Sequence, residues 1–283
     1  MKIGIIGNGF VGKATRVLKS EGIEIMCYDI DPSLCVPEGT TLEDLCNHCD
    51  IIFISVPTPM NKDGSCYLNI VESVVSDISN IVNLDEKIVV IRSTVPAGTS
   101  KRLNCYFMPE FLTEKNFIED FVNNPEWIFG IKECEHDQVF MNTIKKMIDI
   151  AHYNNKIVSN KVTFVTNSEA EMIKLFRNTF LATKIAYCNE IYEFCERSGM
   201  NYDTVREYAT KDLRIGSSHS MVPGHDGKKG YGGTCFPKDI NSLLCEMKRS
   251  GMKSYVIEAV VERNEKVDRP ENDWKLDKGR ATV

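Results

Sequence analysis

This 283-residue sequence has little histidine and tryptophan, no surplus of basic residues and no long apolar run. Its 34 basic residues are outnumbered by 40 acidic ones, and the formal net charge is −6. We therefore exclude a nucleic-acid-binding protein that depends on a basic surface. Without a run of about 20 apolar residues, a membrane-spanning helix is excluded as well. The first ten residues show neither the basic segment nor the long apolar stretch of a signal peptide, so we expect a cytoplasmic protein.

The 11 cysteines are an odd number and are scattered along the chain, which does not suggest a disulfide framework. We expect reduced thiols and no metal site. With 42% hydrophobic residues, the chain is long enough for two cores of moderate size. We predict an α/β fold in which a Rossmann-type, doubly wound parallel sheet at 1–165 precedes an all-helical domain at 166–267. The second domain is expected to contain a long central helix, and the charged tail at 268–283 is expected to be frayed.

Residues 2–6 form a short apolar run that leads into Gly7, Gly9 and Gly12. A helical segment and a second apolar run follow, and that run ends at Asp29. This order of strand, glycine turn, helix, strand and acid is typical of a dinucleotide site. The glycines allow a tight turn and a close approach of the pyrophosphate, and an acid at this position binds ribose hydroxyls. Because the acid would repel a ribose phosphate, NAD is preferred to NADP.

Three further apolar runs read as buried parallel strands, and each ends in polar or proline-rich residues. In open α/β sheets, ligands gather outside the carboxyl ends of the strands. We therefore expect Thr58, Thr94 and Glu110 to line one crevice. Each of them is equally compatible with a simple loop-capping role.

Ser168 and Glu171 have the spacing of a capping box, and residues 169–198 contain neither proline nor glycine. The pattern predicts one helix of roughly 45 Å with apolar residues on more than one side. Such a helix needs partners, and a homodimer that shares it is the simplest case. Lys174 and Asn178 are four residues apart and share a face, which is also compatible with a solvated polar stripe.

Cys235 lies between a glycine pair and Pro237 in the string GGTCFPKD at 232–239. An irregular stretch at 214–234 precedes it, and the proline suits the first turn of a helix. A thiol at a helix N-terminus lies beside backbone N–H groups and the positive end of the helix dipole, which favours the nucleophilic thiolate. The alternative is that this cysteine is a small apolar core residue.

Seven motifs resemble those of the UDP-glucose/GDP-mannose dehydrogenase family, in the family's order and over residues 1 to about 265. They are GNGFVG at 7–12, SVPTP at 55–59, RSTVP at 92–96, PEFLTE at 109–114, KLFRNTF at 174–180, DLRIG at 212–216 and GYGGTCFPKD at 230–239. The resemblance implies two successive NAD-dependent oxidations of the C6 alcohol of a nucleotide sugar, with UDP-glucose as the expected substrate. Family members usually continue into a further Rossmann-type domain that this sequence does not contain, so the resemblance is to a short form.

The resemblance also implies roles for residues at matching positions. Cys235 would capture the aldehyde as a thiohemiacetal that becomes a thioester, with Lys174 and Asn178 stabilising the oxyanion and Asp239 assisting. Thr94 and Glu110 would handle the alcohol proton through water. The residues implied for NAD are Gly7, Gly9, Phe10, Val11, Gly12, Asp29, Pro57, Thr58, Thr94, Glu114 and Lys238. Those implied for the nucleotide sugar are Phe111, Leu112, Thr113, Glu114, Lys174, Asn178, Gly230, Tyr231, Gly232, Gly233 and, from a second subunit, Arg214.

Three alternatives stay open at this point. In the first, the sugar nucleotide is GDP-mannose or a UDP-N-acetyl sugar. In the second, the chain is a two-electron β-hydroxyacid dehydrogenase. In the third, it binds NAD without turnover. The β-hydroxyacid enzymes also join a Rossmann domain to a long helix with a lysine and an asparagine, but they have no use for a covalent thiol. The number of NADH formed per substrate and the effect of replacing Cys235 distinguish these cases.

Overall fold

The computed structural model describes all 283 residues, and the chain divides into two compact units. Unit 1 comprises residues 1–58 and 68–174, and unit 2 comprises residues 59–67 and 175–283. The observed division after Lys174 lies further along the chain than the expected domain boundary after residue 165, and a short early segment joins unit 2.

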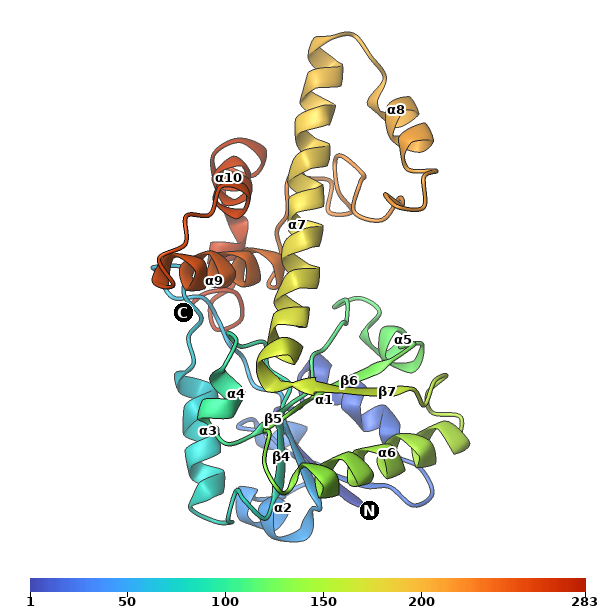
Figure 1. Cartoon of the computed structure of the whole chain (residues 1–283), viewed down its shortest axis with the longest axis vertical. Helices are drawn as coiled ribbons and strands as arrows, with labels where there is room; N and C mark the ends of the chain where they lie inside the picture. Colours follow the sequence, from blue (N-terminus) through green and yellow to red (C-terminus); the bar gives the residue numbers. More distant parts are fainter. The chain divides into compact units, whose positions relative to one another are not determined.

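Unit 1 is built on a seven-stranded sheet with the order β2-β1-β3-β4-β5-β6-β7 and helices on both sides (Figure 1). Ile3 pairs with Ile51, and Ile51 pairs with Ile88, in parallel register. The predicted doubly wound α/β fold is confirmed, with one departure, because β6 runs antiparallel to β5. The strands are β1 (Lys2–Ile6), β2 (Glu24–Tyr28), β3 (Ile51–Ile54), β4 (Ile88–Ile91), β5 (Tyr106–Phe107), β6 (Trp127–Ile131) and β7 (Val162–Thr166).

Two apolar clusters cover the two faces of this sheet, because successive strand residues point to opposite sides. Ile3 and Ile5 belong to the cluster that includes α1, α5 and α6, whereas Ile6 and Ile54 belong to the cluster that includes α2, α3 and the start of α7. The connecting loops at the carboxyl ends of the strands carry Asp29, Thr58, Thr94 and Glu110. The helices of unit 1 are α1 (Phe10–Thr15), η1 (Arg16–Leu18), η2 (Pro32–Leu34), α2 (Leu42–His48), α3 (Asn69–Ser79), α4 (Thr99–Arg102), α5 (Phe117–Val122), α6 (Asp137–Tyr153) and the first part of α7 (Asn167–Arg197).

The long helix α7 is capped differently from the prediction. Thr166 N donates to Glu169 Oε2 at 2.8 Å, and Glu169 N donates to Thr166 Oγ1 at 3.3 Å, which is a reciprocal capping pair. The predicted box of Ser168 and Glu171 is therefore wrong. Glu171 is fully buried and accepts instead from two backbone N–H groups at the start of α4, at 2.5 and 2.8 Å. These bonds hold the start of α7 within unit 1.

Unit 2 is helical, as predicted, and packs two helices on α7. Ala182 and Ala186 of α7 are small enough for close approach and meet Ile240 of α9 and Val260 of α10 in one cluster. The irregular stretch is also confirmed, since no helix or strand lies between α8 and α9. None of the helices in either unit combines the length and apolar composition that a bilayer span requires. The elements are α8 (Tyr202–Ala209), α9 (Phe236–Arg249), α10 (Val256–Arg263), the π-helical turn η3 (Asn264–Asp268) and η4 (Asp273–Leu276).

The C-terminal tail is packed, so the expectation of a frayed segment at 268–283 is wrong. Trp274 is 3% exposed and packs with Met60 and Ala281. Met60 N donates to Ala281 O at 2.9 Å, and Val283 N donates to Met60 O at 3.1 Å. This pairing explains why residues 59–67 belong to unit 2. The charge of the tail misleads because Trp274 and Ala281 still find apolar partners.

Candidate functional site

The glycine turn after β1 has the geometry that a dinucleotide site needs. Gly7 has a φ of +88°, and a Cβ at this position would lie 2.5 Å from a backbone oxygen just after β3. A Cβ at Gly12 would lie 2.1 Å from Gly7 O, whereas a Cβ at Gly9 would meet no atom within 4 Å. Two glycines are therefore required by packing, and Gly9 leaves the turn open. Phe10 and Val11 begin α1 directly after the turn.

Asp29 follows β2 and faces this turn. Its Oδ2 accepts from Asn8 N at 2.6 Å, and its Oδ1 accepts from Asp31 N at 3.0 Å. A carboxylate oxygen has a second lone pair, so both oxygens are still able to accept from ribose hydroxyls. The open glycine turn and the neighbouring acid together fit the pyrophosphate and ribose of NAD.

The loops after β3 and β4 are tied together in unit 1. Thr58 Oγ1 donates to Thr94 O at 2.8 Å, and Ser93 Oγ donates to Val56 O at 2.7 Å. Pro57, beside this contact, is exposed. The structure thus brings Thr58 and Thr94 side by side, and their roles toward NAD and substrate stay predictions.

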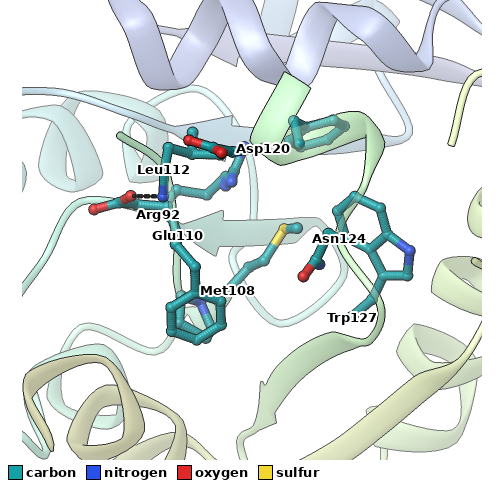
Figure 2. A pocket seen from close by; sticks show the side chains of 10 residues that line it. Arg92, Met108, Glu110, Leu112, Asp120, Asn124 and Trp127 are labelled. Carbon is teal, nitrogen blue, oxygen red and sulfur yellow. Dashed lines mark hydrogen bonds between the residues drawn. The ribbon is translucent and has the colours of Figure 1, made fainter. Parts of the chain in front are cut away.

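Glu110, in the loop after β5, forms a buried ion pair with Lys174 of α7. Glu110 Oε1 lies 2.5 Å from Lys174 Nζ, and the two side chains are 5% and 3% exposed. Glu110 Oε2 also accepts from Leu112 N at 2.9 Å, as Figure 2 shows. Because removing two charges from water is costly, such a pair depends on good geometry and further hydrogen bonds. The sequence predicts both as site residues but does not predict that they pair.

Arg92 is a second buried cation close to Glu110, and the sequence reasoning missed it. Both residues line a small cavity of about 20 Å³, which has room for roughly one water molecule (Figure 2). Arg92 Nη1 donates to Thr15 Oγ1, its Cζ lies 5.5 Å from the centre of the Phe121 ring, and its Nε has no hydrogen-bond partner. Burial lowers the pKa of Arg92 to about 10, although the negative charge of Glu110 opposes this. An arginine directly after a buried strand was the signal that could have found it.

The residues after Glu110 form a loop that is anchored to α5. Thr113 N and Thr113 Oγ1 both donate to Asp120 Oδ2, at 2.7 and 2.6 Å. Phe111 is half-buried, whereas Thr113 and Glu114 are exposed. The structure thus fixes this loop in unit 1, and its contacts with substrate stay predictions.

In unit 2, Cys235 immediately precedes α9, and Pro237 lies in the first turn of that helix. Asp239 N donates to Cys235 O at 3.0 Å, which begins the helical hydrogen bonds. The thiol is half-buried and unoxidised, and Thr234 Oγ1 lies 3.7 Å from its Sγ. The predicted position at the start of a helix is confirmed.

Asp239 binds two other predicted residues of unit 2, Asn178 and Lys238. It is 2% exposed, and its carboxylate accepts from Asn178 Nδ2 at 2.6 Å and from Lys238 Nζ at 2.5 Å. Burial disfavours the ammonium of Lys238, but the negative charges of Asp239 and of an ionised Cys235 outweigh this effect and raise the pKa of Lys238. A fixed cation near the sulfur favours the thiolate.

The roles of Lys174, Asn178 and Arg214 toward the substrate stay predictions. Lys174 and Asn178 are one turn apart on α7, and the division between the units falls between them. Arg214 is on the surface, where its side chain is 90% exposed and pairs with Asp212 at 2.5 Å.

Cys46 and Cys49 have a C-x-x-C spacing, which bears on the expectation of no metal site. They are 0% and 1% exposed and pack in the cluster beneath α2 and α3. Burial raises the pKa of each thiol to about 11. Since redox chemistry and metal binding need the thiolate, these cysteines are core residues. No group of three or more His, Cys, Asp and Glu side chains is arranged as a metal site.

The sheet, its open glycine turn and the helical second unit define a two-unit protein with a Rossmann-type dinucleotide-binding domain. Family models refine this class. The NAD binding domain of the UDP-glucose/GDP-mannose dehydrogenase family matches residues 38–148, and the central domain of the same family matches residues 168–266. The chain belongs to this family, and NAD is the cofactor of its first domain.

Individual relatives agree with this assignment. The UDP-glucose 6-dehydrogenase TuaD of Bacillus subtilis is 32% identical over 94% of this chain, which spans 63% of that protein's length. A UDP-glucose dehydrogenase structure from the archaeon Pyrobaculum islandicum has a TM-score of 0.79 at 25% identity, over 94% of this chain and 68% of that one. A 3-hydroxyisobutyrate dehydrogenase from Mycobacterium tuberculosis has a TM-score of 0.66 at 13% identity, over 99% of this chain and 96% of that one. This last likeness shows a shared fold alone.

Proposed function

We propose that this chain is an NAD-dependent nucleotide-sugar 6-dehydrogenase that oxidises the C6 alcohol of UDP-glucose to a carboxylate through a thioester at Cys235. The observation that carries the proposal is the start of α9, where the thiol precedes Lys238 and Asp239, and where Asn178 binds that aspartate. A two-electron alcohol oxidation has no use for an activated thiol. The names of the relatives support a uridine diphosphate sugar as the substrate.

In the first oxidation, the C6 hydroxyl loses a proton and a hydride and becomes an aldehyde. When bound, NAD supplies the hydride acceptor for each of the two oxidations. Thr94 and Glu110 relay the proton through water in this proposal. Lys174, which is paired with Glu110 at 2.5 Å, stabilises the negative charge that develops on the substrate oxygen.

In the second oxidation, the Cys235 thiolate adds to the aldehyde carbon and forms a thiohemiacetal. Asn178 stabilises the resulting oxyanion, and loss of a second hydride gives the thioester. Water then attacks the thioester carbon, assisted by Asp239, which releases the carboxylate and the free thiol. Two hydrides are transferred and one water is consumed for each sugar nucleotide.

The proposal includes a homodimer that forms through α7. Phe176, Phe180, Tyr187 and Phe194 on this helix are between 59% and 64% exposed. They recur at intervals of four and seven residues, so they lie along one stripe of the helix. A long aromatic stripe that is left to solvent is typical of an interaction surface, and a second copy of the helix presents the same stripe.

The test measures the NADH formed per mole of substrate with NAD and, in separate reactions, UDP-glucose, GDP-mannose and a UDP-N-acetyl sugar. We expect two NADH per UDP-glucose, and we expect Cys235→Ser to lower the rate of acid formation by roughly a thousandfold or more. Thermal stabilisation by NAD serves as the folding control for this variant. One NADH per substrate with an unaffected Cys235→Ser would instead indicate two-electron chemistry. NAD-dependent stabilisation without NADH from any sugar nucleotide would indicate a binding protein.

A further inference from the structure

The loop that leads into Cys235 is held by side chains rather than by a sheet. Tyr231 N donates to Asn264 Oδ1 at 2.8 Å, and Asn264 Nδ2 donates to Tyr231 O at 3.0 Å, so one carboxamide pairs with both backbone groups of one residue. Gly230 N donates to Asn189 Oδ1 of α7 at 3.1 Å. The exposed fractions of Asn264 and Asn189 are 0% and 2%. Water therefore does not replace these bonds when a partner is removed, and the loss is costly.

Arg269 supports the next part of the same loop. A Cβ at Gly232 would lie 2.4 Å from Arg269 Cζ, so the guanidinium occupies the space beside this glycine. The arginine is 4% exposed and is itself held by two bonds of 2.7 Å to Asp273 and by an ion pair of 2.6 Å to Asp226. Because Asp226 lies in the same irregular stretch as Gly232, Arg269 joins two separate parts of that stretch.

The π-helical turn after α10 brings Asn264 and Arg269 to the same side. Arg269 N donates to Asn264 O at 2.8 Å, which is the five-residue hydrogen bond of a π turn. A regular α-helix would point residues five positions apart in different directions. Single π turns are rare and occur frequently at functional sites, because they redirect side chains in this way.

We propose that Asn264 and Arg269 are positioning residues that preorganise the backbone of residues 230–233 for the sugar nucleotide and fix the start of α9, which carries Cys235. The assignment rests on the proposed function. Gly230 and Gly233 have φ of +67° and +72°, and a free glycine-rich segment has many other conformations. Ordering it before binding lowers the cost of binding substrate, and a small displacement of the reacting thiol lowers the rate strongly.

The main test compares Asn264→Ala with Asn272→Gly. Asn272 lies in the same segment, and its Nδ2 donates to Pro270 O at 2.8 Å and to Glu265 O at 3.3 Å rather than to the loop. Its φ of +49° suits glycine. We expect Asn264→Ala to lower kcat/KM for the sugar nucleotide roughly a hundredfold, through both a lower kcat and a higher KM. Asn272→Gly is expected to stay within about threefold of the unmodified protein, and the affinity for NAD is expected to be unchanged in both variants.

Conservative variants separate positioning from general stability. Asn264→Asp retains an acceptor for Tyr231 N, and only its protonated carboxyl donates to Tyr231 O. Its kinetic defect is therefore expected to be smaller at mildly acidic pH than at alkaline pH, relative to the unmodified protein. Arg269→Lys keeps the charge but loses the planar fork that holds Asp273, so we expect a loss of roughly tenfold in kcat/KM.

Deuterium exchange of a peptide that covers residues 228–236 provides a readout that does not need turnover. Exchange is expected to be faster in Asn264→Ala and unchanged in Asn272→Gly. The inference is overturned if Asn264→Ala lowers the melting temperature but has the same exchange rate and the same kcat/KM as Asn272→Gly. If the unmodified protein oxidises no sugar nucleotide, the proposed function fails, and the exchange comparison alone then decides whether Asn264 orders the loop.

Discussion

In unit 1, the long helix α7 places Lys174, which holds Glu110 through a buried ion pair, whereas Cys235 in unit 2 follows an irregular loop. Lys174 lies early in α7, so helical hydrogen bonds fix its backbone, and Glu110 in the loop after β5 is held by its ion pair with Lys174 and by the bond from Leu112 N. Cys235 follows a stretch without helix or strand, which is held by hydrogen bonds from Asn264 and by an ion pair and packing of Arg269.

The two arrangements should respond differently to substitution. The ion pair of unit 1 is buried, so loss of one partner affects stability and turnover together. Tyr231 of the loop belongs to the apolar core of unit 2 and still packs there when a supporting bond is lost. We therefore expect such a loss to affect the geometry at the thiol more than the stability of the unit. The measurement that distinguishes the two units is therefore whether a substitution lowers stability and activity together or only one of them.

The largest effect is expected for Lys174→Met, which leaves the buried carboxylate of Glu110 without its partner at 2.5 Å. We expect the free energy of unfolding to fall by about 3 kcal/mol. The kcat is expected to fall roughly a hundredfold to a thousandfold, because the substrate oxygen loses its cation. Urea unfolding and NADH formation measure the two quantities.

The double variant Glu110→Gln, Lys174→Met is the control for this prediction. It removes both charges, so part of the lost stability should return while turnover should not. Full stability also depends on Arg92, because its buried charge then loses the nearby carboxylate of Glu110. A single Lys174→Met variant as stable as the unmodified protein would contradict the argument, and a double variant that regains turnover would show that Lys174 acts only in folding.

Local signals in the sequence explain what could be predicted of the fold. The apolar strand runs, the glycine turn and the long helix without proline all act within a few residues, and the structure contains each of them. The cap of α7 could not be predicted, because Thr166 with Glu169 and Ser168 with Glu171 have the same spacing. What decides between them is the long-range contact of Glu171 with α4.

In the candidate site, too, features with local sequence signals could be predicted and features set by long-range contacts could not. Pro237 and the adjacent glycines predict that Cys235 begins a helix, because helix starts have local signals. The two hydrogen bonds between the Asn264 side chain and the Tyr231 backbone join residues 33 positions apart. They depend on a π turn, which has no sequence pattern of its own. Long-range pairs of this kind have no local signal in a single sequence.

A smaller effect is expected at the exposed stripe of α7. Phe180→Glu places a charge among the aromatic side chains, and we expect the dissociation constant of the proposed dimer to rise roughly tenfold or more. Sedimentation velocity over a range of concentrations measures this. Glu196→Gln is the control, because it also changes one charge on α7 but lies roughly 160° around the helix from Phe180. An unmodified protein that is monomeric at all concentrations would rule out the dimer.

The smallest effect is expected at Asp268, which ends the π turn beside the loop. Its Oδ1 lies 3.0 Å from Arg263 Nη2, its Oδ2 has no hydrogen-bond partner, and burial raises its pKa from 3.8 to about 6 against the opposing charge of Arg263. Since the folded-state pKa lies above the unfolded value, the folded state holds this proton more tightly. Its contribution to stability is therefore fully present below pH 3.8 and is lost as the pH rises through about 6.

Relative to Asp268→Asn, the free energy of unfolding of the unmodified protein should fall by roughly 1–3 kcal/mol across this pH interval and then stay constant. Urea unfolding of both proteins at a series of pH values checks the difference, and parallel curves would contradict it. If Asp268→Asn also keeps kcat/KM near that of the unmodified protein at neutral pH, stability and activity separate in unit 2. Lys174→Met in unit 1 is expected to lose both stability and activity. The two variants together therefore test whether a buried ion pair and a loop held by side-chain hydrogen bonds position reactive groups by different physical means.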